Sequence, residues 1–165
     1  MPHELTPQDI EIMQKELDYR RIELMPELLE EVKRTRAFGD LSENYEYKAA
    51  KQAQNANRKR IRYLTRMIQN STVLEDTSAA DEVGLFDRVE LYFEEDDELQ
   101  TVQVVSTVRC DPREGRISRE SPLGRVLLGR RVGDKVTVKV SDAYSYEVEI
   151  RSITKTQDDG SAPVL

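Results

Sequence analysis

One short stretch decides how this 165-residue chain folds: Gly39-Asp40-Leu41-Ser42-Glu43-Asn44-Tyr45-Glu46-Tyr47. On both sides of it apolar residues recur at helical spacing. The seam of the preceding helix consists of Ile10, Met13, Leu17, Leu24, Leu28 and Val32, and that of the following helix of Tyr47, Ala50, Gln54, Asn57, Ile61, Leu64 and Ile68. Because a short connection makes two helices antiparallel neighbours, the sequence predicts a coiled-coil hairpin over residues 1–75 with an acidic tip at 39–44.

Signals within the two arms refine this prediction. Thr6 can cap the first helix, and Gly39 can adopt the left-handed conformation that ends it. Pro26 removes one backbone donor inside the first arm, so we expect a kink rather than a stop. Two polar seam residues, Gln54 and Asn57, are expected to fix the register of the pair at some cost in stability. Arms of about 30 residues reach roughly 45 Å at the helical rise.

The second half of the chain has a different periodicity. After a polar linker at 76–83, apolar residues alternate with polar ones, which indicates strands at 88–93, 101–108, 136–140 and 146–150. Ser121 and Pro122 are typical of the start of a short helix. The sequence therefore predicts an α+β protein, in which the hairpin is followed by a small antiparallel β domain with a short helix over 84–155 and by a flexible tail over 156–165.

The composition excludes several classes of function. The chain has one His and one Cys, so zinc-finger sites and His-dependent catalytic triads are excluded, and any metal must be held by carboxylates, which favour Mg²⁺ or Mn²⁺. The net charge of −7 argues against a protein that coats nucleic acid non-specifically. No signal peptide or membrane-spanning run is evident, so we expect a cytoplasmic protein with no membrane contact.

Two motifs resemble those of the bacterial Gre transcript cleavage factors. The stretch at 39–47, followed by Ala49 and Ala50, is similar to the family's tip motif, and residues 121–129 with Gly133-Asp134 are similar to its C-terminal signature. The resemblance covers roughly residues 5–153. It implies an FKBP-like C-terminal domain and a monomer that enters the secondary channel of RNA polymerase. There the protein stimulates the polymerase's own Mg²⁺-dependent cleavage of the nascent transcript in backtracked or arrested complexes, so it is a cofactor and not itself an enzyme.

The resemblance also assigns residues. Asp40 and Glu43 match the acids that help hold the second catalytic Mg²⁺, and Arg36 and Lys51 match positions that contact the 3′ end of the nascent RNA. Residues expected to position the tip are Gly39, Leu41, Asn44 and Tyr47, and those expected to dock on the polymerase are Ser121, Pro122 and Leu123. Contact with nucleic acid, including DNA, is expected only inside the transcription complex.

Asp40 and Glu43 could bind a metal ion, or they could have the simpler role of capping the second helix. Two-metal phosphodiester hydrolysis needs a pair of cations roughly 4 Å apart, and carboxylates bind such ions. Asp40 and Glu43, three apart at a helix start, can face one point, yet two carboxylates alone bind Mg²⁺ weakly and need a pocket that supplies more. The simpler interpretation is a capping box, with Asp40 as the cap of the second helix and Glu43 at its third position.

Other interpretations remain open from the sequence. Lys33, Arg34 and Lys48 extend a basic patch near the tip or lie on a solvated helix face. A regulator of the same fold could enter the polymerase channel without stimulating cleavage, although its tip should then carry extra acids or another acid spacing. A prolyl isomerase needs an aromatic-lined pocket, and residues 84–165 have no Trp and few Phe. In a generic coiled-coil adaptor the tip motif would be accidental.

Overall fold

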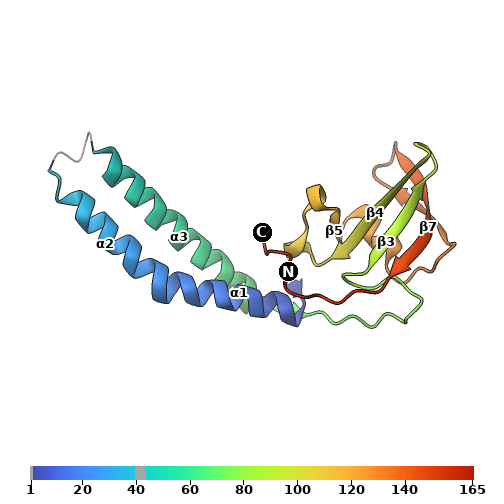
Figure 1. The fold of residues 1–165 in the computed structure, drawn as a ribbon, viewed down its shortest axis with the longest axis horizontal. Helices are drawn as coiled ribbons and strands as arrows, with labels where there is room; N and C mark the ends of the chain where they lie inside the picture. The colour runs from blue at the N-terminus through green and yellow to red at the C-terminus, as the bar shows by residue number, and fades with distance from the viewer. Residues whose placement is uncertain (1, 40–43) are drawn as a thin grey trace. The chain divides into compact units, whose positions relative to one another are not determined.

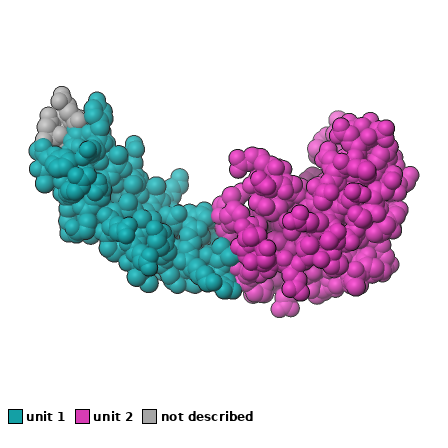
Figure 2. All heavy atoms as spheres, viewed as in Figure 1, with its two compact units in different colours: residues 1–3, 10–72 teal, residues 4–9, 73–165 magenta. Residues whose placement is uncertain are grey.

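The computed structural model describes residues 2–39 and 44–165 and divides into two compact units, which are drawn in teal and magenta in Figure 2. Unit 1 contains residues 1–3 and 10–72, and unit 2 contains residues 4–9 and 73–165. The α+β class is confirmed, with a helical hairpin followed by a β domain. The predicted boundaries differ in that residues 4–9 and the linker at 76–83 belong to unit 2.

The hairpin consists of α1 (Pro7–Tyr19), a π-helical turn (Arg20–Leu24) and α2 (Met25–Arg36), which run against α3 (Tyr45–Gln69) (Figure 1). The seam agrees with the prediction, and its buried members are Met13, Leu17, Val32, Ala50, Gln54, Asn57, Ile61 and Leu64. Met67 is also buried, although the three-and-four spacing did not select it. Among the described helices, none is long and apolar enough to cross a membrane.

The expected effect of Pro26 takes the form of the π-helical turn. Pro26 lies in the first turn of α2, directly after this turn, and the helix continues through it. The amide of Met25 donates to the carbonyl oxygen of Arg20, five residues earlier. This backbone hydrogen bond therefore spans one residue more than the bonds of an α-helix do. Pro26 itself has no amide proton to donate, and its position directly follows this wider turn.

Polar seam residues bond across the hairpin at this same level. The Asn57 amide donates to the carbonyl oxygen of Arg20 at 3.3 Å and accepts from its guanidinium at 3.0 Å. One turn away, Glu16 accepts from Arg60 of α3 and from Arg20. The bonds between Asn57 and Arg20 and between Glu16 and Arg60 join residues that are 37 and 44 positions apart. They can therefore form in only one register of the two helices. Gln54 makes a weaker bond, accepting from Lys51 at 3.4 Å within α3.

Unit 2 is built on a five-stranded sheet in the order β5-β4-β3-β7-β6 (Figure 1). Its strands are β3 (Arg88–Phe93), β4 (Glu98–Val105), β5 (Arg116–Ser118), β6 (Lys135–Lys139) and β7 (Ser145–Thr154). Helix α4 (Pro122–Leu127) packs its buried Leu127 into a core cluster with Val89, Leu91, Val104, Val138, Val148 and Ile150. A separate two-stranded sheet pairs β1 (His3–Leu5) with β2 (Ser71–Val73).

The sheet differs from the predicted one in two places. Strand β4 ends at Val105, because the chain then forms two short 3₁₀ turns, Thr107–Arg109 and Pro112–Glu114. Strand β5 was not predicted, and it pairs parallel to β4, so the sheet is not wholly antiparallel. Its three residues are all half-buried and therefore carry no alternation that a sequence pattern could detect.

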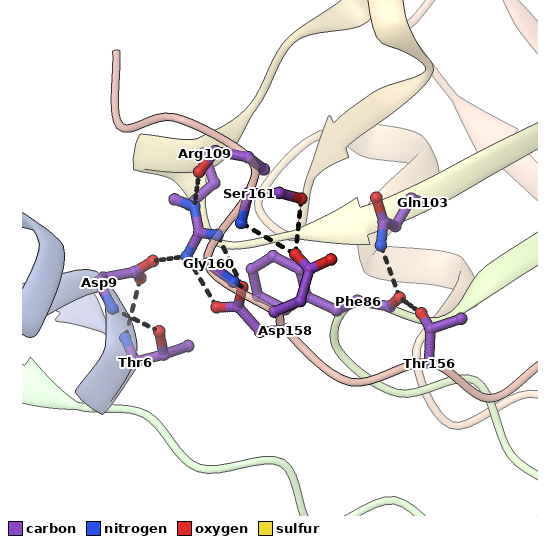
Figure 3. A network of polar contacts seen from close by, with 11 residues as sticks. Thr6, Asp9, Phe86, Gln103, Arg109, Thr156, Asp158, Gly160 and Ser161 are labelled. Atoms are coloured by element: carbon purple, nitrogen blue, oxygen red, sulfur yellow. Dashed lines mark hydrogen bonds and ion pairs between the residues drawn. The ribbon is translucent and has the colours of Figure 1, made fainter.

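The segment 156–165 has no regular secondary structure, but its contacts differ from those expected of a flexible tail (Figure 3). Asp158 forms a two-pronged ion pair with the fully buried guanidinium of Arg109, both distances being 2.7 Å. The same guanidinium donates to Asp9 at 3.0 Å and to the carbonyl oxygen of Ala162 at 2.6 Å, and it lies over the Phe86 ring. A buried guanidinium needs such partners, and the tail supplies most of them.

Ionisation of Glu16 should make hairpin stability depend on pH. Hydrogen bonds from Arg60 and, against an opposing effect of burial, from Arg20 lower the pKa of Glu16 below its ordinary value. A lowered pKa in the folded state contributes stability at neutral pH that is lost as the pH falls through that pKa. We expect Glu16→Gln to reduce the free energy of unfolding by up to about 1 kcal/mol at pH 7 and by much less near pH 3, measured by denaturation followed through helical circular dichroism. An equal difference at both pH values would contradict this.

Removal of the Asp158 carboxylate should destabilise unit 2, because it leaves a buried guanidinium short of two hydrogen bonds. We expect Asp158→Ala to lower the free energy of unfolding by about 2 kcal/mol. Asp159→Ala is the matched control, because that carboxylate bonds only to the exposed Ser161, and its effect should stay within about 0.5 kcal/mol. Thermal unfolding of both variants checks this, and equal losses would show that the tail contacts are not specific to Arg109.

Candidate functional site

The candidate site is the end of the hairpin at which α2 and α3 are connected. α2 ends at Arg36 and α3 begins at Tyr45. Gly39 has the expected positive φ, +94°, but the C-cap of α2 is Ala37, so the prediction that Gly39 ends the first helix is wrong by one position. Three predicted site residues, Asp40, Leu41 and Glu43, lie outside the described residues.

Asn44 joins the two helices at this end. Its side-chain oxygen accepts from the amide of Tyr47 at 3.0 Å, so Asn44 is the N-cap of α3. Its side-chain nitrogen donates to the carbonyl oxygen of Thr35 in the last turn of α2 at 2.7 Å. Free amides at a helix start and free carbonyls at a helix end both need partners, and one side chain serves both here. Thr35 itself is fully buried, and its hydroxyl bonds back to the carbonyl oxygen of Glu31.

The capping-box interpretation of the tip acids is wrong, because Asn44 occupies the N-cap of α3 and the helix starts one residue later. The sequence pattern Asp-x-x-Glu suggested a cap four residues too early. Tyr47 lies half-buried at the third helical position, which fits its predicted place at the start of the seam. The side-chain cap of α3 is therefore an amide and not the Asp40 carboxylate.

The basic side chains near this end fall into two groups. Arg34 pairs with Glu31 at 2.6 Å and approaches Glu46 at 3.7 Å, and Lys33 lies 3.8 Å from Glu30. The hydrogen bonds that Arg34 donates to Glu31 raise the pKa of Arg34 and lower the pKa of Glu31. These two cations are already neutralised by carboxylates of their own hairpin, so they are weak candidates for binding phosphate.

Arg36 and Lys51 form the second group. Arg36 is exposed and makes no ion pair with another described residue, and within the described residues Lys51 donates one side-chain bond, at 3.4 Å to Gln54. Lys48 lies over the ring of Tyr45 at 5.4 Å without a carboxylate partner among the described residues. Near this end, the basic side chains that have no carboxylate partner among the described residues are thus Arg36, Lys51 and Lys48.

In unit 2 the predicted docking residues lie at the start of α4. Ser121 caps this helix by accepting from the amide of Gly124 at 3.1 Å, as expected. Pro122 is exposed and Leu123 is half-buried against the core, so this short segment presents one apolar residue to solvent and anchors the next. Gly124 lets the helix approach β5, because a Cβ there would meet the carbonyl oxygen of Ser118 at 2.1 Å.

Sequence reasoning missed two features of unit 2. Arg109, which follows the predicted strand 101–108 and was assigned no role, is the buried centre of the network described above. Three aromatic side chains, Phe93, Tyr144 and Tyr146, line one hollow, although the low aromatic count argued against any such pocket. Among the described residues, no cluster of three or more potential metal ligands is present.

Comparisons with known proteins match both parts of the chain. A family model described as "Transcription elongation factor, N-terminal" matches residues 3–73, and one described as "Transcription elongation factor, GreA/GreB, C-term" matches residues 77–155. The first match contains the whole tip stretch, and the second contains Ser121 to Leu123.

Individual relatives agree with these models. The chain is 42% identical over 136 residues to transcription elongation factor GreA of Geobacillus kaustophilus, which covers 82% of this chain and 86% of the relative. It is 33% identical over 150 residues to GreA of Macrococcus caseolyticus, covering 91% and 95%. A solved structure of GreA factor homolog 1 (Gfh1) of Thermus thermophilus is 27% identical, with coverage of 94% and 100% and a TM-score of 0.43.

The two bonds of Asn44 can be separated by substitution. Asn44→Ala removes both, and we expect it to destabilise the hairpin by about 1–2 kcal/mol and to speed hydrogen exchange at the amide of Tyr47. Asn44→Asp keeps the acceptor for Tyr47 but loses the donor to Thr35, so that amide should stay protected while the last turn of α2 exchanges faster. Nuclear magnetic resonance measures both amides. Unchanged exchange at Tyr47 in Asn44→Ala would contradict the capping role.

Proposed function

The chain belongs to the GreA/GreB family of transcription elongation factors, and from this premise we propose that it binds RNA polymerase through the secondary channel and stimulates cleavage of the nascent transcript. The proposed targets are backtracked or arrested complexes, in which the 3′ end of the RNA has left the active site. The protein would be a cofactor that completes the polymerase's own nuclease site, acting as a monomer.

The observation that carries this proposal is the place of the tip stretch in the hairpin. Asp40 and Glu43 fall between the end of α2 at Arg36 and the start of α3 at Tyr45. Asn44 provides the side-chain cap of α3 and the link to Thr35, so neither of these two bonds uses Asp40 or Glu43. We infer that the two carboxylates serve a partner and not the hairpin itself.

The donor set fits Mg²⁺, which prefers oxygen ligands and commonly takes one or two protein carboxylates. The bound ion would neutralise charge that develops on the phosphodiester as it is hydrolysed. Asp40 and Glu43 would hold it together with carboxylates of the polymerase, because two carboxylates are too few for a stable site. This division explains why such a protein can act only inside the polymerase.

Arg36 and Lys51 are proposed to bind phosphates of the RNA 3′ end. Both flank the tip stretch, Arg36 as the last residue of α2 and Lys51 in the second turn of α3. Their charges are not neutralised by carboxylates among the described residues, in contrast to Lys33 and Arg34. Neither cation would have to give up a carboxylate partner within the described part of the chain in order to bind phosphate.

The start of α4 is proposed as the docking point of unit 2 on the polymerase. Its exposed Pro122 and half-buried Leu123 form a small apolar surface on a helix that Ser121 and Gly124 hold rigidly against the sheet. Rigid anchoring suits a docking contact, because little side-chain entropy is lost on binding.

The test is a transcript-cleavage assay on stalled RNA polymerase with the full-length chain. We expect the wild-type protein to stimulate Mg²⁺-dependent cleavage, and Asp40→Asn and Glu43→Gln each to reduce the stimulated rate about a hundredfold, since several kcal/mol of charge stabilisation is lost. Glu46→Gln is the matched control, because Glu46 is an exposed acid of the same stretch that approaches only Arg34.

Binding to the polymerase must be measured beside the rates. Both acid variants should bind like the wild type, which separates a metal role from a folding defect. Full stimulation by both variants would overturn the metal role. Wild-type protein that binds but fails to stimulate would instead support a channel-binding regulator of the same fold.

A further inference from the structure

A hollow of about 140 Å³ opens at one end of the sheet of unit 2. We call it the aromatic cup, and it is lined by Phe93, Glu95, Asp96, Tyr144, Tyr146 and Glu147. These residues come from the end of β3, the β3–β4 turn and the β6–β7 hairpin. The proposed function uses none of them.

Three rings form the wall of the cup. Phe93 and Tyr146 stack with their centroids 5.9 Å apart, and Tyr144 follows 6.0 Å from Tyr146. Phe93 and Tyr146 rest against the apolar core, which fixes their positions. Tyr144 is 49% exposed at the turn, so an aromatic surface is open to solvent here.

The rim of the cup is acidic. Of the five consecutive acids at 94–98, Glu95 and Asp96 line the cup, and Glu147 adds a third lining carboxylate. Glu94 is paired with Lys135 at 3.1 Å, and Glu95 accepts the hydroxyl of Tyr144 at 2.7 Å. Asp96 and Glu147 have no ion-pair partner within 4.0 Å among the described residues. Negative charge therefore remains at the mouth of an aromatic pocket.

A neighbouring site in the same sheet shows which group such surroundings favour. Alternation along β3 places Tyr92 on the opposite face from Phe93. There the guanidinium of Arg151 lies 4.6 Å from the centre of the Tyr92 ring and 3.2 Å from Glu149. An aromatic face and a carboxylate thus already bind an arginine of this chain on one face. The cup offers three rings and three lining carboxylates, and the nearby Lys135 pairs with Glu94, which does not line the cup.

We propose that the aromatic cup binds a lysine or arginine side chain from a basic segment of a partner protein. The ring faces attract the cation through their quadrupoles, and the rim carboxylates accept its hydrogen bonds. Charge complementarity selects this occupant, because the rim is negative. Each contribution is modest at an exposed site, so one inserted side chain gives weak binding that serves as a supplementary contact.

A proline ring is the main competing occupant, since aromatic pockets also bind proline. The rim argues against it. An apolar ring would cover Glu95, Asp96 and Glu147 without giving them a hydrogen-bond donor, and burial of unpaired carboxylates is unfavourable. A cation supplies the donors that these oxygens need.

The test uses three capped pentapeptides with the full chain: alternating glycine and arginine, the same peptide with citrulline for arginine, and alternating glycine and proline. Ring resonances of Tyr144 and Tyr146 report binding by nuclear magnetic resonance. We expect the arginine peptide to shift both rings and to bind at least tenfold more tightly than the other two. Equal binding of the citrulline or the proline peptide would overturn the proposal.

Variants locate the site. Tyr144→Leu should weaken the arginine peptide about fivefold, and Tyr144→Phe, which keeps the ring, less than twofold. The triple variant Glu95→Gln/Asp96→Asn/Glu147→Gln should weaken it about tenfold. The triple control Glu75→Gln/Asp81→Asn/Asp159→Asn removes the same charge from outside the cup and should change binding less than twofold. Equal losses in both triple variants, or self-association that only the cup variant abolishes, would contradict a partner's side chain as the occupant.

Discussion

The hairpin depends on one constraint: two helices must stay in a single register along a narrow seam that is only partly apolar. Part of the seam is packed by buried apolar side chains, those of Met13, Leu17 and Leu64. Closer to the connection between α2 and α3, the buried seam residues include the polar Gln54 and Asn57. Buried polar groups are tolerable only where their hydrogen bonds are met. Asn57 finds its partner in the Arg20 carbonyl at the π-helical turn, so the irregularity that accommodates Pro26 also fixes the register. At the far end Asn44 completes the pairing by joining Thr35 to Tyr47.

Much of this arrangement could be predicted from the sequence, because helices and alternating strands leave local periodic patterns. The seam, the left-handed Gly39, the Ser121 cap and the β6–β7 hairpin follow from residues within a few positions of one another. The cap of α3 was misplaced because Asp40 and Asn44 are both good capping residues, and the pattern alone does not say at which one a helix starts. The sequence indicated an irregularity in the first arm only through Pro26, and it did not predict a π-helical turn.

Features that depend on distant partners could not be predicted. Arg109 meets Asp9 and Asp158, which are 100 and 49 positions away, and no local pattern distinguishes it from a surface arginine. The aromatic cup likewise combines Phe93 with Tyr146 through the pairing of β3 and β7. Composition suggested too few aromatic residues for a pocket, but it counts residues without saying which ones the fold collects. Both features form because the fold of unit 2 brings together residues that are far apart in the sequence.

The central claim is that the two tip acids contribute ligands to a Mg²⁺ ion that acts in the polymerase. A titration of Mg²⁺ in the cleavage reaction of a stalled complex measures this directly. The account predicts that the wild-type chain lowers the Mg²⁺ concentration for half-maximal cleavage relative to the Asp40→Asn variant bound to the same complex. If both proteins give the same midpoint and differ only in maximal rate, the acids do not help to hold the ion, and the claim is wrong.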